Sequence, residues 1–232
     1  MSASPSCNIC GSTEFVDVNH RQRVLCGACG SYERTRLMKL HIDALDLPSS
    51  ARVMHFAPER GLSVWLREKF SNYVAGDYDL ERYSHIPGML KVDLCQRDYQ
   101  LPGPFDLILH SHVIEHLPCN YTAVLLKLHK LLTPGGRHLF SIPVYGRSYE
   151  ESLASLSHEE ATSRFGQFDH VRRFSAADID RTIGAIFDLP REYRLTDSFS
   201  AQVLRAAQIP EDAWQGYTGH SVFSFRREDL II

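Results

Sequence analysis

The chain has 232 residues, which suits one sizeable domain with a small appendage, and its hydrophobic fraction of 44% is ordinary for a globular protein. Its 25 basic and 28 acidic residues give a net charge of −3, so the composition offers no general electrostatic footprint for nucleic acid. Apolar runs stay well short of the roughly 20 residues that cross a bilayer, and the first twenty residues lack a secretory pattern, so we expect a soluble, cytoplasmic protein without a membrane partner.

Two cysteine pairs open the chain, and fifteen residues separate them: Cys7-x-x-Cys10 and Cys26-x-x-Cys29. Each pair places two thiolates on a tight turn, and the segment between them is long enough for a hairpin. All four sulfurs could then surround one Zn²⁺ ion. Two disulfides or four unrelated thiols are the alternatives, which the missing secretory signal disfavours. Two further cysteines, Cys95 and Cys119, are expected to remain free thiols.

The charge of this first segment bears on what a zinc ribbon would do here. The first 46 residues hold five basic and five acidic side chains. Three of the basic ones cluster just after the second cysteine pair, namely Arg34, Arg36 and Lys39. A phosphate-binding module would normally be clearly basic. We therefore interpret residues 1–47 as a structural ribbon with a connecting helix, followed by an α/β domain over residues 48–232.

The α/β domain begins with a strand, a turn and a helix start around residues 52–70. Nucleotide-binding folds place a glycine loop at this turn, so that the backbone can approach the cofactor closely. Here His55, Ala57 and Glu59 stand where an acid and two glycines are usual, and only Gly61 remains. Taken alone, this pattern fits an ordinary strand–helix corner equally well.

The next short strand ends in a carboxylate at Asp77. A carboxylate at a strand end can accept hydrogen bonds from both hydroxyls of a ribose, so Asp77 is the candidate ribose ligand, with Tyr78 beside it. A solvated acidic turn is the alternative, because two more acids follow closely. A third strand covers residues 89–92 and ends at Asp93 and Leu94.

A strand–helix–strand unit spans residues 104–143. The apolar run from Phe105 to Leu109 is too short for a helix, and a helix followed by Pro134-Gly-Gly and a second strand comes after it. The first strand ends in polar residues that include His110, Ser111, His112 and His116. Open parallel sheets bind ligands at such strand ends. A second metal ion at the three histidines is not expected, since no acid stands at matched ligand spacing.

Residues 165–174 form a glycine-containing, aromatic and charged stretch, which suits an active-site lid better than a core segment. His170 and Arg172 alternate along an extended backbone, so both side chains could reach the same side. Two further strands, Glu192 to Asp197 and His220 to Arg226, would close the sheet as an antiparallel pair.

Together these motifs are similar to a bacterial group of zinc-ribbon-bearing class I S-adenosylmethionine (SAM) methyltransferases with a type 11-like domain. The similarity covers roughly residues 7–180 and is carried by four motifs. They are Cys29-Gly-Ser-Tyr-Glu-Arg-Thr-Arg-Leu37, His55-Phe-Ala-Pro-Glu59, Asp106-Leu-Ile-Leu-His-Ser-His-Val-Ile-Glu-His116 with the later Pro134-Gly-Gly136, and Phe165-Gly-Gln-Phe-Asp-His-Val-Arg172. The resemblance implies an α/β fold with a Rossmann-like, seven-stranded sheet and a small N-terminal zinc ribbon.

The resemblance also implies a SAM site across the ends of the first four strands. Ala-Pro-Glu is that group's own version of the cofactor loop, so Glu59 would contact SAM, and Asp93 with Leu94 would lie at the adenine. The full set of expected cofactor contacts is His55, Ala57, Glu59, Gly61, Asp77, Tyr78, Asp93, Leu94, His110 and Ser111.

The leading hypothesis for function is methyl transfer from SAM to an oxygen, or less readily a nitrogen, of a small-molecule or glycan acceptor. The acceptor must be held in line and must lose a proton. His170 is the candidate base and His112 its rival, because imidazole titrates near neutral pH. Arg172, Tyr145 and His116 are expected to bind the acceptor, which the guanidinium suggests is anionic.

Two other function classes stay open. An rRNA or tRNA methyltransferase that reads RNA with its ribbon would need a more basic surface than this chain offers. A non-catalytic interaction protein on a methyltransferase scaffold would explain the eroded glycine loop. That hypothesis would not explain the presence of Asp77, Asp93 and His170.

Overall fold

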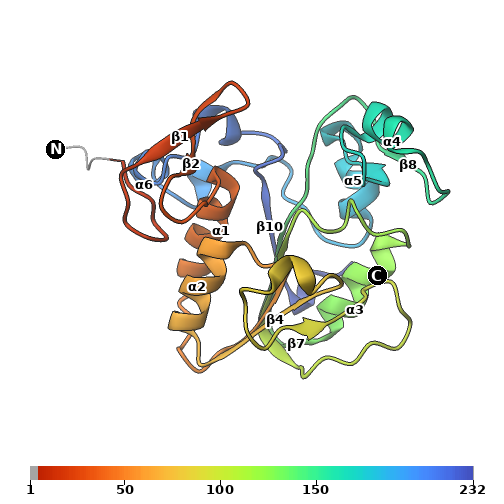
Figure 1. Cartoon of the computed structure of the whole chain (residues 1–232), viewed down its shortest axis with the longest axis horizontal. Helices are drawn as coiled ribbons and strands as arrows, with labels where there is room; N and C mark the ends of the chain where they lie inside the picture. The colour runs from red at the N-terminus through yellow and green to blue at the C-terminus, as the bar shows by residue number, and fades with distance from the viewer. Residues whose placement is uncertain (1–4, 232) are drawn as a thin grey trace.

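A six-stranded sheet is the centre of the computed structural model, which describes residues 5–231. The outermost ends of the two expected domains, residues 1–4 and 232, therefore lie outside the described residues. The strands lie in the order β10-β7-β6-β3-β4-β5, and β10 alone runs antiparallel to its neighbour (Figure 1). Their bounds are β3 Arg52–Phe56, β4 Asn72–Asp77, β5 Leu90–Lys91, β6 Phe105–Ser111, β7 Leu132–Ser141 and β10 Val222–Arg226.

The remaining elements surround this sheet. The helices are α1 Glu33–Asp43, α2 Arg60–Lys69, α3 Tyr121–Lys130, α4 His158–Phe165, α5 Ile179–Thr182 and α6 Ala201–Ala206. Two small antiparallel pairs lie outside the main sheet, β1 Phe15–Val18 with β2 Arg21–Cys26, and β8 Glu150–Glu151 with β9 Arg172–Arg173. None of the helices within residues 5–231 combines the length and apolarity that a bilayer crossing requires.

The strand order agrees with the class I methyltransferase sheet that the resemblance implied, but the main sheet of the described residues has six strands rather than seven. The expected strand from Glu192 to Asp197 is wrong. Leu195–Asp197 forms a single 3₁₀ turn, and Ser198 and Phe199 donate backbone hydrogen bonds back to the Leu195 carbonyl. The chain therefore curls into α6 instead of extending along the sheet edge.

Pro134-Gly-Gly does not end the helix, contrary to the prediction. Helix α3 already stops at Lys130, and β7 starts at Leu132. The pairing of β7 with β6 shifts register across this segment, where Gly135 has a φ of +79°. Because glycine adopts this left-handed conformation without a Cβ clash, the motif forms a bulge within the strand.

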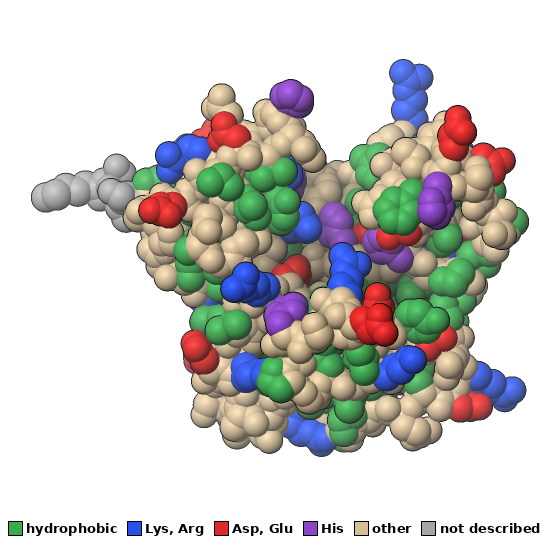
Figure 2. All heavy atoms as spheres, in the orientation of Figure 1, with side chains coloured by type: hydrophobic (Ala, Val, Ile, Leu, Met, Phe, Trp, Pro, Cys, Tyr) green, Lys and Arg blue, Asp and Glu red, His purple; other side chains and the backbone are tan. Residues whose placement is uncertain are grey.

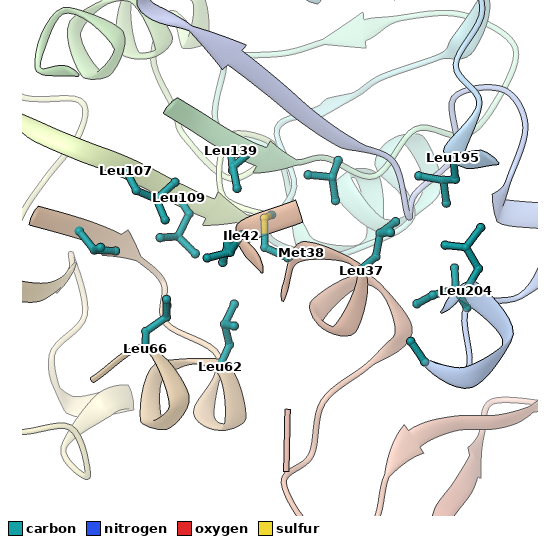
Figure 3. Packing of buried hydrophobic residues seen from close by; sticks show 14 of the residues in the cluster. Leu37, Met38, Ile42, Leu62, Leu66, Leu107, Leu109, Leu139, Leu195 and Leu204 are labelled. Atoms are coloured by element: carbon teal, nitrogen blue, oxygen red, sulfur yellow. The ribbon is translucent and has the colours of Figure 1, made fainter. Parts of the chain in front are cut away.

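Alternating side chains of the strands fill a core on each face of the sheet. Leu107 and Leu109 of β6 face α1 and α2, whereas Ile108 packs with α3 on the opposite face. Figure 3 shows the first of these cores, in which leucines of both helices meet the sheet and the C-terminal residues Leu195 and Leu204. Helix α1 is thus a core helix of the sheet domain, although it directly follows the cysteine pairs.

Cys95 and Cys119 form a disulfide, so the expectation of two free thiols is wrong. Cys95 follows β5, and Cys119 lies between β6 and α3. Both connections run along the edge of the sheet where the parallel strands end, which brings their Cα atoms to 5.7 Å, within the range that a disulfide spans. The sequence separation of 24 residues conceals this proximity.

Gly61, near the start of α2, contacts the cysteine pairs. A Cβ atom at this position would lie 3.0 Å from both the carbonyl oxygen and the Sγ atom of Cys29. Real Cβ atoms rarely approach other atoms so closely, so only glycine allows α2 to pack this tightly against Cys29. The one glycine that the cofactor loop retains therefore serves packing between the two parts of the chain.

We predict that Gly61→Ala lowers the free energy of unfolding by about 1–3 kcal/mol, because overpacking pushes α2 away from Cys29. Urea denaturation followed by circular dichroism measures this loss. Gly27→Ala is the matched control, since its added Cβ would meet its nearest neighbours at an ordinary 3.7 Å. Equal stability of Gly61→Ala and the wild type would contradict the packing role.

Candidate functional site

A cavity of about 1120 Å³ opens where the parallel strands end. Its walls come from the ends of β3, β4 and β6, the residues after β5, the start of α1 and the segment 167–170. Figure 2 shows this hollow in the middle of the face, with histidine, acidic and basic side chains gathered around it. Pockets for one ligand commonly measure about 300–1,000 Å³, so this cavity has room for two reactants.

Seven of the ten expected cofactor contacts line the cavity. They are Ala57, Glu59, Asp77, Tyr78, Asp93, Leu94 and Ser111. The other three, His55, Gly61 and His110, do not line it. His110 is buried inside the molecule, where its Nε2 lies 3.1 Å from Nε2 of His138 and its ring stacks on Phe140. The three polar residues that end β6 thus do not all face the same space.

The turn after β3 has Ala57 in a left-handed conformation and a buried histidine behind it, where a glycine loop is usual. Ala57 takes a φ of +48°, the left-handed conformation for which glycine is usual, and its N–H donates to the Gly76 carbonyl at 3.2 Å. His55, fully buried behind the turn, lies with Nε2 3.1 Å from Oε2 of Glu59 and Nδ1 3.1 Å from the Tyr73 hydroxyl. His55 therefore positions Glu59 rather than contacting a ligand.

Glu59 presents a negative charge to the cavity. Burial opposes ionisation, but the hydrogen bond from His55 and the charges of His55 and Arg34 outweigh it and hold the Glu59 pKa below its usual value. Its second oxygen, Oε1, is buried and has no hydrogen-bond partner within residues 5–231. A cationic ligand group could pair with it.

Asp77 and Asp93 stand side by side at the ends of neighbouring strands. Oδ1 of Asp77 accepts the Asp79 N–H at 2.8 Å, and Oδ1 of Asp93 accepts the Cys95 N–H at 2.9 Å. Burial raises the pKa of Asp77. Each carboxylate is oriented by one local hydrogen bond, and its other oxygen makes none that involves the described part of the chain, so both can accept hydrogen bonds from a ligand.

A cluster of ionisable side chains forms another part of the cavity wall. Glu115, His116 and His170, called the Glu115 cluster below, each bring one ligand-type atom to within 4.8 Å of the others. His112 adjoins them, with Nδ1 3.5 Å from Oε1 of Glu115. Glu115 is fully buried, and burial raises its pKa to about 8.

Both candidate bases lie in this region, with different freedom to act. His170 Nδ1 lies 3.1 Å from the Phe165 carbonyl and donates to it, so Nε2 is left with its lone pair. Burial lowers the His170 pKa, and the neighbouring His116 lowers it further. His112 donates from Nε2 to the Gly219 carbonyl at 3.2 Å, and burial lowers its pKa to about 3. Both imidazoles are thus neutral at physiological pH.

Arg172, expected at the acceptor, does not line the cavity. It is fully buried, and its guanidinium donates to the Ile114 carbonyl, to the Cys119 carbonyl at 2.8 Å and to Glu151 at 2.8 Å. The pairing of β9 with β8 turns this side chain toward the loops that follow β6, so alternation with His170 does not bring both into one site. Arg172 connects loops, and each of its three nitrogen atoms already donates to a protein acceptor.

Tyr145 is likewise not part of the cavity wall. Its hydroxyl donates to the Phe165 carbonyl, and its ring packs against the backbone of Gly166. A Cβ at Gly166, which has a φ of +77°, would lie 3.0 Å from that hydroxyl. Tyr145 therefore holds the turn that precedes His170. His116, the third expected acceptor contact, does line the cavity.

Arg34 and Glu115 line the cavity although the sequence analysis gave neither a role there. Arg34 lies at the start of α1, its guanidinium sits 4.7 Å over the Tyr32 ring, and its Nε is buried without a partner among the described residues. Both residues belong to motifs quoted above, Glu-Arg-x-Arg and Glu-His. Those motifs were the available signal, but neither shows which side chain faces the ligand.

The four cysteines at the N-terminus form a second candidate site. Their sulfur atoms all lie within 4.8 Å of one another, with Cys7 to Cys29 at 3.6 Å and Cys10 to Cys26 at 3.5 Å. Sulfurs bound tetrahedrally to zinc at about 2.3 Å are roughly 3.8 Å apart. The observed spacing fits such an ion.

Comparison with known proteins adds a family match. A family model described as a methyltransferase domain matches residues 30–184, which is more than half of the chain. No curated protein matches.

Solved structures with a related arrangement include coclaurine N-methyltransferase bound to N-methylheliamine and SAH, at 12% identity and a TM-score of 0.47. That match covers 78% of this chain and 56% of the other, so the chain spans little more than half of that enzyme's length. The YcgJ protein from Bacillus subtilis matches at 16% identity and a TM-score of 0.42, over 75% of this chain and 78% of its own. A SAM-dependent methyltransferase from Clostridium acetobutylicum matches at 19% identity and a TM-score of 0.39, over 53% and 57%.

Arg172→Lys should lower the free energy of unfolding by about 2 kcal/mol or more, because a single ammonium cannot replace the guanidinium's donors and leaves buried carbonyls unpaired. Chemical denaturation measures the effect. Arg147→Lys, at an exposed position, is the control and should leave stability unchanged. Wild-type stability of Arg172→Lys would refute its structural role.

Proposed function

The chain belongs to the methyltransferase-domain family, and on this premise we propose that it moves a methyl group from SAM to an oxygen, less readily a nitrogen, of a small-molecule or glycan-type acceptor. The observation that carries the proposal is the composition of the cavity of about 1120 Å³ at the strand ends. Carboxylates on neighbouring strand ends line part of it, as a nucleoside requires, and neutral histidines line another part, as an acceptor that must lose a proton requires.

SAM would lie across the strand ends with its nucleoside toward β4 and β5. Asp77 would accept hydrogen bonds from the ribose hydroxyls, while Asp93 and Leu94 would contact the adenine. At the methionine end, the ammonium group would meet Glu59 and the carboxylate would meet Arg34. Support for this end comes from the unpartnered, buried Oε1 of Glu59 and Nε of Arg34, two opposite charges that suit a zwitterion.

The acceptor would lie against the histidines, with its nucleophilic oxygen in line with the methyl group and the departing sulfur. The sulfonium of SAM makes that methyl group electrophilic. His170 would take the acceptor proton, because its Nε2 is free while Nδ1 is held by the Phe165 carbonyl. His112 would keep the site in shape, since its Nε2 donates to the Gly219 carbonyl and its Nδ1 faces Oε1 of the buried Glu115 at 3.5 Å.

The N-terminal cysteine cluster would hold a structural Zn²⁺ ion, as supported by its sulfur–sulfur distances. An RNA-reading role for this ribbon receives no support from the nearby basic residues. Arg36 is fully buried and donates to four backbone carbonyls, and Lys39 is nearly buried and paired with Asp43. These two cations contribute no exposed patch that could hold phosphates.

Asp77→Ala should weaken SAM binding about tenfold or more, because the loss of a carboxylate–hydroxyl pair is worth about 1–3 kcal/mol. Calorimetric titration with SAM measures the dissociation constant. Asp98→Ala, an exposed aspartate, serves as the control and should bind SAM like the wild type. If the wild type does not bind SAM, the proposed function is wrong. If the wild type binds SAM and Asp77→Ala binds it equally well, the ribose contact lies elsewhere, with Asp79 the next candidate.

His170→Ala should lower turnover by roughly 10²–10⁴ while SAM affinity stays nearly intact, since the imidazole acts on the acceptor and not on the cofactor. Transfer of a labelled methyl group to acceptors found by screening measures the rate. His158→Ala, an exposed histidine of α4, is the matched control. Normal turnover in His170→Ala would exclude it from the chemistry and make His112 the candidate.

A further inference from the structure

Glu115 poses a physical problem that acid–base chemistry alone does not solve. Its side chain is fully buried, and neither carboxylate oxygen has a hydrogen-bond partner within residues 5–231. With its pKa raised to about 8, the group avoids a buried charge by staying protonated, but a buried carboxyl group without hydrogen-bond partners is still costly. A metal ion would pair with the ionised carboxylate and remove this cost. Glu115 is also one of the residues that line the cavity, so its carboxyl group lies next to the space that a ligand would occupy.

The two histidines of the Glu115 cluster are prepared in a way that suits metal binding. His170 donates from Nδ1 to the Phe165 carbonyl at 3.1 Å. His116 has Nδ1 3.3 Å from both the carbonyl oxygen and a carboxylate oxygen of Asp169. Metal-binding histidines typically donate their other ring nitrogen to a carbonyl or carboxylate, which fixes the tautomer and orients the ring. Both Nε2 atoms are then left as donors of a lone pair.

The spacing of the cluster is close to that of a coordination sphere. One ligand-type atom from each residue lies within 4.8 Å of the others, and His116 Nε2 is 4.0 Å from Oε1 of Glu115. Ligands bound at about 2.1 Å lie roughly 3–3.5 Å apart, so small side-chain rotations would complete the set. The rings of His116 and His170 lie next to each other at the cavity wall, with their centroids 4.6 Å apart.

We propose that Glu115, His116 and His170 bind a divalent first-row transition ion such as Zn²⁺ or Fe²⁺ in the cavity, at a site distinct from the four cysteines. Two imidazoles and one carboxylate suit such ions, whereas Ca²⁺ and Mg²⁺ prefer oxygen ligands throughout. Three protein ligands leave coordination positions open toward the cavity, as in catalytic rather than structural metal sites.

The role of this ion rests on the proposed function. An acceptor hydroxyl at an open coordination position loses its proton more easily, as water bound to a metal ion does. The proton would pass to water in the cavity. The oxygen would then form a bond to the methyl carbon while the carbon–sulfur bond breaks and its electron pair stays on sulfur. With its Nε2 on the ion, His170 would be a metal ligand rather than the free base described above, and the ion would promote loss of the acceptor proton in its place.

The experiment measures metal content in the full chain without relying on activity. Wild-type protein is loaded with Zn²⁺, desalted and analysed for metal; it should retain two ions per chain. Glu115→Gln and His170→Ala should each retain one, as should Cys26→Ser, which loses the other ion. His158→Ala should retain both. Circular dichroism of each variant verifies its fold.

A Co²⁺ titration separates the two sites by their ligands. The cysteine site should show sulfur-to-cobalt charge-transfer absorption, and the Glu115 cluster should show only the weaker ligand-field bands of nitrogen and oxygen ligands. Glu115→Gln should weaken the second binding event about tenfold or more. The proposal is overturned if the wild type holds one ion only, or if Glu115→Gln and His170→Ala bind the second ion like the wild type.

Calorimetric titration with SAM tests the proposed function separately from the metal site. A second ion without SAM binding would leave the metal site standing and refute methyl transfer. SAM binding without a second ion would refute the metal site and leave the proposed function, with His170 as a free base.

Discussion

The buried guanidinium of Arg36 is the interaction on which the N-terminal part of the structure depends. It donates to the carbonyls of Val24 and Ser31 beside the cysteine pairs, and to those of Ala207 and Gln208 after α6. Without it, carbonyl groups that lie far apart in the sequence would lose a donor, although the Ser31 carbonyl would keep the N–H of Cys26. Arg36 thereby fixes α1 between the hairpin and the C-terminal segment. The same helix brings Arg34 to the cavity wall, so the position of a cavity-lining charge follows from a contact in the core.

Local patterns predicted the sheet well, because strands and the acids that end them are short-range features. Strands β3, β4 and β6 lie where the apolar runs predicted strands, and the expected Asp77 and Asp93 line the cavity. Features that depend on distant partners were not predictable in this way. The bond between Cys95 and Cys119 and the turn at Leu195 depend on where chain segments meet, which spacing along the sequence does not reveal.

The candidate site shows the same limit at the level of single side chains. Alternation predicts that His170 and Arg172 lie on the same side of the chain. Pairing of β9 with β8 instead directs Arg172 to the loops, where it donates to backbone carbonyls. Gly61 fitted the cofactor pattern by position, yet a glycine is needed there because a side chain would clash with Cys29. Residue type predicts which chemistry is available, and only packing decides which side chains can reach a ligand.

Helix α1 connects the two candidate sites, the cysteine cluster and the cavity. Its first turn follows directly from Cys29, and its second residue lines the cavity. If the proposed ligand held Arg34 in place, it would also stabilise the turn that orders the cysteines, and the proposed ion at the cysteines would stabilise Arg34. By thermodynamic reciprocity, each ligand must then raise the affinity of the other by the same factor. The ribbon would thus make occupancy of the cavity responsive to the free metal concentration around the protein.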